Sequence, residues 1–248
     1  MNKIFLTITL LAILFGCENS SKHTSNKIAI TEEQQWIILF DGTSTDQWRA
    51  THSEHFPDQG WYIAEGELLN DGTSSGNLIS TSQYSDFILE WEWRLFDEGG
   101  NSGLKYFVKE NSGKDHDAAL GLEYQMLDDD RHEWMIAGKM KPNDYHTTGA
   151  LYEFIPPSAQ KKMVPLGEFN SSKIISDGKH VEHWLNGIKV VEYERGSDEF
   201  LEMKAKSKFR DLPEFGLPEE GYILLQDHSS RVGFRNIRIK ILDTKDPK

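Results

Sequence analysis

The sequence predicts an all-β domain made of two packed antiparallel sheets, with one short helix. Short apolar segments alternate with turn residues, an Asn-Gly pair marks a hairpin, and Trp and Phe are abundant, at 7 and 13 residues. A fold of strands joined by crossover helices would need repeated stretches of helical period, which the chain lacks. Two antiparallel sheets packed face to face are the arrangement that such a pattern favours.

The predicted strands follow one another between turn signals. The chain reverses tightly at Glu65-Gly66, and Asn186-Gly187 can adopt the two positive φ values of a type I′ turn, which predicts a hairpin over 180–193. Acidic residues in the first turn and lysines towards the end of 197–208 predict the one helix, since they suit its macrodipole. The other predicted strands are residues 36–40, 61–64, 68–69, 87–96, 104–108, 120–127, 222–226 and 232–241.

The first residues predict export and lipid attachment. Lys3 precedes an apolar run over 4–15 that is too short for a permanent membrane span, and Gly16-Cys17 follows it like the lipobox of bacterial lipoproteins. Residues 1–17 are therefore interpreted as a lipoprotein signal peptide and Cys17, the only cysteine, as the lipid acceptor. The alternative is an ordinary signal peptide with an incidental cysteine. We expect an exported lipoprotein, in the outer membrane or facing the periplasm, held to the membrane by its lipid alone.

The mature chain is predicted to hold a polar tether over residues 18–34 and a single domain over 35–243. The chain carries 27 Lys and Arg against 40 Asp and Glu, for a net charge of −13. This charge repels nucleic acid and anionic lipid heads, so nucleic acid is not an expected partner. Neutral or cationic small ligands are more suitable partners.

Polar residues occur on two central strands where a plain sandwich core would not require them. Asn101 lies in the glycine-rich segment 99–103, predicted to be a close-approach turn, and Lys105 follows it. Glu123 and Gln125 project to the same face of the next strand, because side chains alternate along a strand. A carboxylate beside an amide is awkward in a core and useful in a ligand groove. The alternatives are a flexible connection for 99–103 and a solvated acidic turn for the aspartates that follow Gln125.

The last two strands carry a second polar group. Gln226 and His228 are predicted to share a face, while Asp227 points away or turns with the loop. An aspartate beside a histidine can orient or charge the imidazole for proton transfer, although structural histidines outnumber catalytic ones. Arg235 interrupts an apolar strand, and its alternative role is a salt bridge to a neighbouring strand.

Metal binding is open at the level of sequence. No zinc-type His/Cys spacing and no calcium-loop pattern occurs, so no cofactor is certain. A divalent metal ion remains chemically feasible, and its candidate ligands are Glu123, Asp128, His132 and His228.

The chain resembles the 3-keto-disaccharide hydrolase family. The segments that carry the resemblance are WIILFDGTSTDQW (36–48), FILEWEWRLFDEGGNSGLKYFV (87–108), GLEYQMLDDDRH (121–132), HWLNGIKVVEYE (183–194) and GYILLQDHSSRVGFRNIRI (221–239). The resemblance implies a concanavalin A/laminin-G-like jelly-roll fold. It also implies a carbohydrate-active enzyme, a lyase, hydratase or net hydrolase, that acts on glycosides oxidised to a ketone at C3. A separate sugar dehydrogenase would supply that ketosugar.

The implied chemistry removes the C2 proton and eliminates the C1 substituent, which needs a base, an acid and a cation near the enolate oxygen. We expect His132 or His228 to be the base or acid, with Asp128 or Asp227 as its orienting partner. Lys105 is expected to stabilise the enolate.

The remaining site residues are expected to bind substrate. Arg235 is a second candidate for the enolate. The residues expected to hold sugar hydroxyls or a metal are Asn101, Glu123, Gln125 and Gln226.

The alternative function is a non-catalytic carbohydrate-binding module, because one fold hosts many functions. Trp48, Trp61, Trp134 and Trp184 could stack on sugar rings. Binding alone would not need an Asp-His pair or clustered carboxylates, so the enzyme is favoured. A surface adhesion protein fits less well, since the chain has no repeats.

Overall fold

Two antiparallel sheets packed face to face form the structure, a computed structural model that describes residues 36–113 and 118–242. The predicted fold class is confirmed. The predicted signal peptide with Cys17, and the tether, lie outside the described residues. Within the described part of the chain, no helix is long and apolar enough to cross a membrane.

The larger sheet has eight strands in the order β11-β10-β9-β6-β13-β4-β3, with β1 paired to β13. A bulge in β13 between Arg235 and Arg238 divides this strand, so that its first half pairs with β4 and its second half with β1. The strands are β1 (Trp36–Phe40), β3 (Trp61–Ala64), β4 (Glu67–Asn70), β6 (Phe87–Leu95), β9 (Asn170–Asp177), β10 (His180–Leu185), β11 (Ile188–Glu194) and β13 (Val232–Ile241).

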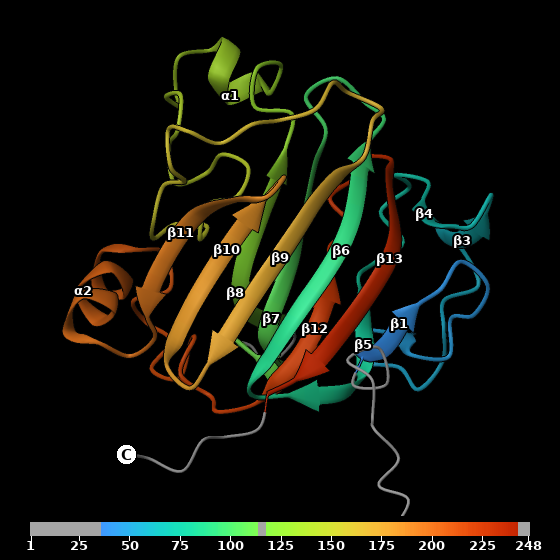
Figure 1. The fold of residues 1–248 in the computed structure, drawn as a ribbon, viewed down its shortest axis with the longest axis horizontal. Coiled ribbons are helices and arrows are strands. Elements are labelled where there is room, and N and C mark those ends of the chain that lie inside the picture. Colours follow the sequence, from blue (N-terminus) through green and yellow to red (C-terminus); the bar gives the residue numbers. More distant parts are fainter. Residues whose placement is uncertain (1–35, 114–117, 243–248) are drawn as a thin grey trace, which may run out of the picture.

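The smaller sheet has five strands in the order β2-β5-β12-β7-β8 and lies behind the larger one in Figure 1. Every pair of neighbouring strands in it is antiparallel. Its strands are β2 (Trp48–Ala50), β5 (Leu78–Tyr84), β7 (Asn101–Ser112), β8 (Ala118–Leu127) and β12 (Gly221–Leu225).

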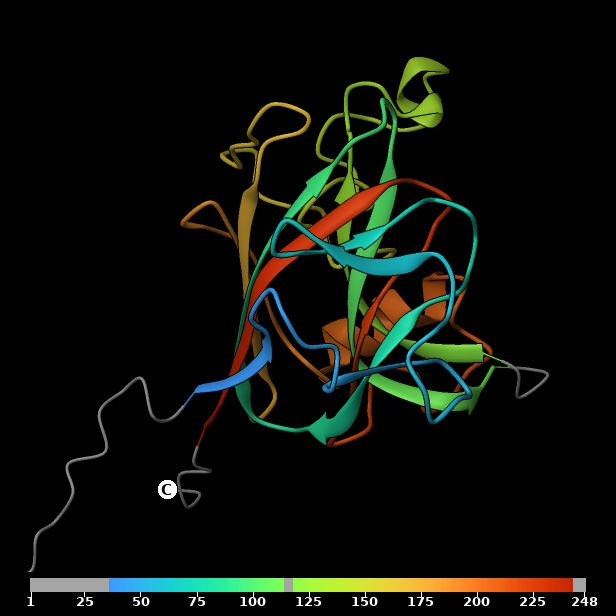
Figure 2. The same ribbon diagram turned by 90° about the vertical axis from the view of Figure 1, so that its right-hand side faces the viewer.

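Two short helices lie outside the sheets. The predicted helix is α2 (Asp198–Lys206), which begins where Ser197 Oγ accepts a hydrogen bond from Phe200 N at 3.2 Å. A second helix, α1 (Glu133–Ile136), is only one turn long and projects at one end of the molecule (Figure 2). The sequence pattern misses α1 because one turn is too short to show helical period.

The core lies between the sheets, where alternate residues of each strand meet. In β6 the inward-facing residues are Phe87, Leu89, Trp91, Trp93 and Leu95, none more than 4% exposed. Burial of each such side chain contributes about 1.5–3 kcal/mol, so this strand alone is a large part of the hydrophobic stabilisation.

The predicted hairpin turn is confirmed. Asn186 and Gly187 have φ values of 48° and 80°, as a type I′ turn requires, and they join β10 to β11. Because the turn fixes the register, it also fixes which of the alternating side chains of β10 face the core and which face outwards.

A buried polar network joins the two sheets. Tyr106 Oη of β7 lies 2.8 Å from His183 Nε2 of β10 and 2.7 Å from Tyr193 Oη of β11. His183 Nδ1 lies 3.1 Å from the carbonyl oxygen of Gly149, which can only accept, so Nδ1 carries the proton and Nε2 accepts from Tyr106. Burial lowers the pKa of His183 to about 4, so this imidazole is neutral at neutral pH.

We expect this network to make the protein less stable as the pH falls from about 6.5 to about 4. In that range the unfolded chain protonates residue 183 while the folded chain does not, so the free energy of unfolding decreases. The shift corresponds to about 3 kcal/mol at about 1.4 kcal/mol per pKa unit. We therefore expect the free energy of unfolding, measured with urea, to fall more steeply with decreasing pH in the wild type than in His183→Gln. An ordinary pKa for His183 in an NMR titration would contradict the expectation.

Candidate functional site

Polar side chains of β7, of β8 and of the segment that follows β12 line a hollow of about 170 Å³ on the outer face of the smaller sheet, which we call the sheet pocket. The volume is smaller than the roughly 300–1,000 Å³ of pockets for drug-sized ligands, so a single small ring is a suitable occupant. The lining residues are Asn101, Lys105, Leu120, Gly121, Glu123, Gln125, Tyr152, Lys208, Phe209, Gln226 and His228.

Strand alternation explains why these residues face outwards. Leu104 and Tyr106 of β7 are fully buried in the core between the sheets, so Lys105 between them projects to the opposite face. Likewise Tyr124 of β8 is buried in the core, and its neighbours Glu123 and Gln125 face the sheet pocket. The shared face that the sequence predicts for these two residues is confirmed.

Gly103 lies next to the side chains of Glu123 and Gln226, within β7 rather than in the turn predicted for 99–103. It lies opposite Gln125 of β8, and its carbonyl oxygen accepts a hydrogen bond from Gln226 N at 2.9 Å. A Cβ atom at this position would lie 2.7 Å from Glu123 Oε1 and 3.2 Å from Gln226 Oε1. The absence of a side chain here therefore leaves room for the carboxylate and the amide to converge.

Lys105 and Glu123 form an ion pair across β7 and β8, with 3.6 Å between Lys105 Nζ and Glu123 Oε2. Their side chains are 14% and 10% exposed. The pair places a cation and an acceptor of hydrogen bonds in a hollow with limited access to water, where charge interacts more strongly than at an open surface.

Two amide oxygens at the sheet pocket have no hydrogen-bond partner among the described residues. These are Gln226 Oε1 and Asn101 Oδ1, and both atoms are buried. Buried acceptors in proteins nearly always have a donor, so these two need one that the chain's described residues do not provide. Hydroxyl groups of a bound ligand would be suitable donors.

Tyr152 and Lys208 form a wall of the sheet pocket that the sequence did not predict. Tyr152 N donates to the carbonyl oxygen of Glu123 at 3.0 Å, and Lys208 Nζ donates to Tyr152 Oη at 3.1 Å. Burial first, and then the negative charge of Glu123, raise the pKa of Tyr152, so its phenol remains protonated. Tyr152 lies in an irregular segment with no period that could have indicated it, and Lys208 lies just after α2, at the end of the stretch predicted to be helical.

Of the two histidines predicted to transfer protons, His228 lines the sheet pocket and His132 does not. His132 caps α1, where its Nδ1 accepts a hydrogen bond from Trp134 N at 3.3 Å. Burial lowers the pKa of His132, and the negative charge of the neighbouring Glu133 opposes this effect in part.

Asp128 and Asp227, predicted to orient the histidines, make other contacts. Asp128 Oδ2 accepts from Gly99 N at 3.0 Å, and Arg131 Nη1 lies 3.3 Å from it. Asp227 Oδ2 accepts from Gly76 N at 3.0 Å, so this carboxylate points away from the sheet pocket, as the alternation predicts. Both carboxylates thus stabilise loops at the end of the sandwich.

Arg235 lies on the larger sheet and not at the sheet pocket. Its Nε is 2.6 Å from Glu92 Oε2, and its guanidinium lies 3.7 Å from the ring centre of Phe169. The structure thus shows the salt bridge to a neighbouring strand that was the alternative for this residue.

The four candidate metal ligands do not form a compact group among the described residues. In residues 36–113 and 118–242, the one set of three or more His, Cys, Asp or Glu with ligand atoms within 4.8 Å of one another is on another strand pair. Glu123 and His228 both line the sheet pocket, whereas Asp128 and His132 lie outside it.

The chain matches one family model and one curated protein over most of its length. Residues 35–240 match the family described as the 3-keto-alpha-glucoside-1,2-lyase-like domain. A 3-keto-disaccharide hydrolase from Bacteroides thetaiotaomicron is 32% identical over 234 residues, which cover 84% of this chain and 79% of that protein.

Two crystal structures from Parabacteroides distasonis, both assigned provisionally as glycosyl hydrolases, share the fold. The first has a TM-score of 0.74 and 32% identity, and the match covers 86% of this chain and 98% of that chain. The second has a TM-score of 0.59 and 25% identity, and covers 84% of this chain and 99% of the other. The similarity therefore extends over nearly the whole sandwich.

Proposed function

Since the chain belongs to the family of the 3-keto-alpha-glucoside-1,2-lyase-like domain, we propose that it cleaves 3-keto-glycosides in the sheet pocket. The observation that carries the proposal is the convergence of the Lys105–Glu123 ion pair, two unpaired amide oxygens and His228 in one hollow. A ligand rich in hydroxyls that develops negative charge during its reaction would complement this set of groups.

The ketone at C3 determines the chemistry. It acidifies the C2 proton, so a base can remove that proton and leave an enolate whose negative charge lies on the C3 oxygen. The enolate electrons then form the C1–C2 double bond as the bond from C1 to the leaving oxygen breaks, and that oxygen takes a proton. Water can add to the unsaturated sugar. We propose that a separate sugar dehydrogenase supplies the ketone.

The geometry supports one assignment of roles. His228 removes the C2 proton, and Lys105 stabilises the charge on the C3 oxygen. Tyr152, whose phenol stays protonated, donates to the leaving oxygen. Asn101 and Gln226 accept hydrogen bonds from sugar hydroxyls with the oxygens that otherwise have no partner.

The alternative, a carbohydrate-binding module, gains no support from tryptophans at the sheet pocket. Trp48 and Trp61 are 2% and 3% exposed and belong to the core, so neither can stack on a sugar. Trp184 lies on the larger sheet, and Trp134 is on α1, so neither lines the sheet pocket. The polar lining of the sheet pocket thus favours a catalytic site over a surface that binds sugars by aromatic stacking.

The test is to incubate the protein with 3-keto-glucosides of both anomers and with the unmodified parent glucosides, with and without EDTA. We expect release of the aglycone from a 3-keto-glucoside and none from the parents. Reversible binding of the unmodified sugars without turnover of any ketosugar would instead favour the binding module. A loss of activity in EDTA would add a metal ion to the proposal.

Gly103→Ala should lower kcat/KM by at least about tenfold while the protein stays folded. The new methyl group would meet the ends of two flexible side chains, Glu123 and Gln226, so the sheet survives but both groups move. Small displacements in an active site can cost up to about 100-fold in rate. Kinetics with the ketosugar and a thermal melt check this, and full activity would show that the two groups need not converge.

We also propose that the protein is exported and anchored through a lipid on Cys17. The sequence supports this proposal, because the apolar run over 4–15 is followed by a small residue, Gly16, and then by the only cysteine. Cys17→Ser should abolish incorporation of a fatty-acid label and move the protein from the membrane to the soluble fraction. Labelling that persists in this variant would contradict the proposal.

A further inference from the structure

The hairpin formed by β10 and β11 carries acidic residues and a histidine on its outer face. His180 is paired with Glu194 and Glu182 with Glu192 across the two strands, so all four side chains lie on one face. The residues between them face the core. Two carboxylates directly opposite each other repel, so Glu182 and Glu192 favour cations beside them, and the ammonium of Lys189 is one such cation.

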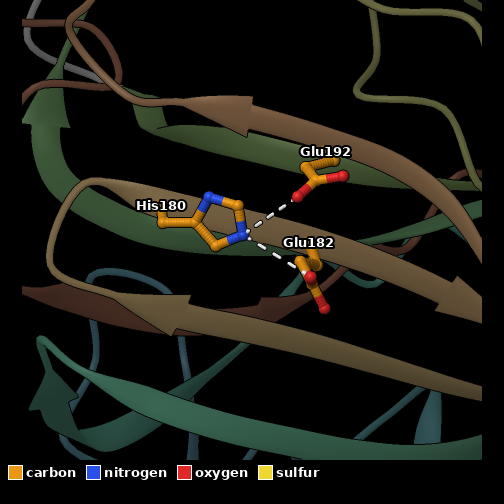
Figure 3. A group of neighbouring side chains, drawn as sticks. All are labelled: His180, Glu182 and Glu192. Carbon is orange, nitrogen blue, oxygen red and sulfur yellow. Dashed lines mark hydrogen bonds and ion pairs between the residues drawn. The ribbon is translucent and has the colours of Figure 1, made fainter.

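Three of these side chains point towards one another, and a ring nitrogen of His180 faces a carboxylate oxygen of Glu182 and one of Glu192, as Figure 3 shows. His180 Nε2 lies 3.5 Å from Glu182 Oε1 and 3.4 Å from Glu192 Oε1, and the three ligand atoms are all within 4.8 Å of one another. Donors about 2.1 Å from a tetrahedral ion are about 3.4 Å apart. We propose that His180, Glu182 and Glu192, the hairpin cluster, bind a divalent metal ion of the zinc class.

A second contact supports metal binding independently of these distances. His180 Nδ1 lies 2.9 Å from Glu194 Oε1, so Nδ1–H donates to this carboxylate and Nε2 faces the other two glutamates. The hydrogen bond to Glu194 raises the pKa of His180, so an ion that binds Nε2 has to displace a proton from it. Histidine ligands of metal ions are held in this way by a carboxylate on the other ring nitrogen. The arrangement fixes both the tautomer and the ring orientation that an ion needs.

The remaining oxygens of the two ligand carboxylates have other partners. Trp184 Nε1 donates to Glu182 Oε2 at 2.7 Å, and Lys189 Nζ lies 2.7 Å from Glu192 Oε2. Lys189 Nζ also lies 3.1 Å from Glu182 Oε1, one of the proposed ligand atoms. The ammonium therefore competes with an ion for that oxygen, and its removal should increase metal affinity.

The hairpin cluster is separate from the sheet pocket, because it lies at the edge of the larger sheet and the sheet pocket lies on the smaller one. The inference therefore does not depend on the proposed function. An ion at this position would link the edge strand β11 to β10 and stabilise the folded protein by binding it in preference to the unfolded chain.

The test is calorimetric titration of tag-free protein with ZnCl₂, together with thermal melts. We expect one ion per chain at the hairpin cluster and a rise in Tm with zinc. His180→Ala and Glu192→Gln should each abolish this binding, and Glu194→Gln should weaken it about tenfold or more. Lys189→Met should tighten it. The matched control is His55→Ala, which removes a histidine between β2 and β3 and should leave zinc affinity unchanged.

Two results would overturn the inference. One is a wild-type protein that binds no zinc. The other is zinc binding and a zinc-dependent rise in Tm that are unchanged in both His180→Ala and Glu192→Gln. Glu192 is exposed, so its isosteric replacement should leave the fold intact and keep the test decisive even if the histidine variant is unstable.

Discussion

Glu123→Gln is expected to lower kcat/KM for a 3-keto-glucoside by about 10²–10³-fold while the protein keeps its fold. The substitution preserves the shape of the side chain but removes the charge that holds Lys105 3.6 Å away. Lys105 is then free to leave the position in which it would stabilise the enolate, and loss of one such stabilising group typically has this effect. Steady-state kinetics with the wild type alongside measure the change.

The chain offers a closely matched control for this variant. Glu110, on the same strand β7 as Lys105, pairs with Arg49 at 2.7 Å, and these side chains are 15% and 10% exposed. Glu110→Gln also breaks an ion pair of the smaller sheet, but outside the sheet pocket, so it should lower stability and leave kcat/KM unchanged. Equal losses of activity in both variants would mean that Glu123 acts only through general stability.

A double variant separates the role of Glu123 from that of its partner. If Glu123 acts by positioning Lys105, then Lys105→Met combined with Glu123→Gln should be little worse than Lys105→Met alone. If the double variant instead loses kcat/KM by the product of the two single losses, each residue contacts the substrate independently.

His228→Asn is expected to lower kcat/KM by about 10²–10⁴-fold, the usual contribution of a group that transfers a proton. His228 is the histidine that lines the sheet pocket, and asparagine keeps a polar side chain of similar size without the basic nitrogen. Single-turnover measurements with the ketosugar should place the loss in the chemical step.

The control for His228→Asn is the same substitution at the other candidate histidine, His132→Asn. The Nδ1 atom of His132 already accepts a hydrogen bond from Trp134 N as the cap of α1, and asparagine is also a good cap. Its loss of activity should therefore be much smaller than that of His228→Asn. The reverse order would transfer the base to His132 and require α1 to move towards the sheet pocket.

Strand alternation made much of this site predictable from sequence. Glu123 and Gln125 are two residues apart in a segment whose other residues are apolar, so one face of a buried strand had to be polar. Gln226 and His228, which were expected to share a face, both line the sheet pocket beside Glu123, although they follow the end of β12 rather than lie within a strand. The period of a strand determines which residues share a face before any tertiary contact is known.

Other features depend on tertiary contacts that no local pattern encodes. Tyr152 and Lys208 reach the sheet pocket from irregular segments that are far apart in sequence. Arg235 breaks an apolar strand as a catalytic residue could, yet its partner Glu92 lies on a neighbouring strand 143 positions away. Strand β9 was missed because NSSKIISD is largely polar, and its role follows from pairing with β6 and β10.

The position of Gly103 shows the same limit. A glycine-rich stretch predicts a turn, but the close approach at this glycine is between two side chains, from β8 and from the residue after β12, within a continuous sheet. The sequence contains the glycine, whereas the reason for it lies in residues 20 and more than 100 positions away.

The central claim is that cleavage proceeds through removal of the C2 proton. The most direct measurement is NMR of a 3-keto-glucoside treated with the protein in D₂O. We predict that the C2 proton signal disappears as the aglycone is released, either because the unsaturated sugar carries no proton at C2 or because water returns deuterium there. Release of the aglycone with the C2 proton fully retained would contradict the account and indicate direct displacement at C1.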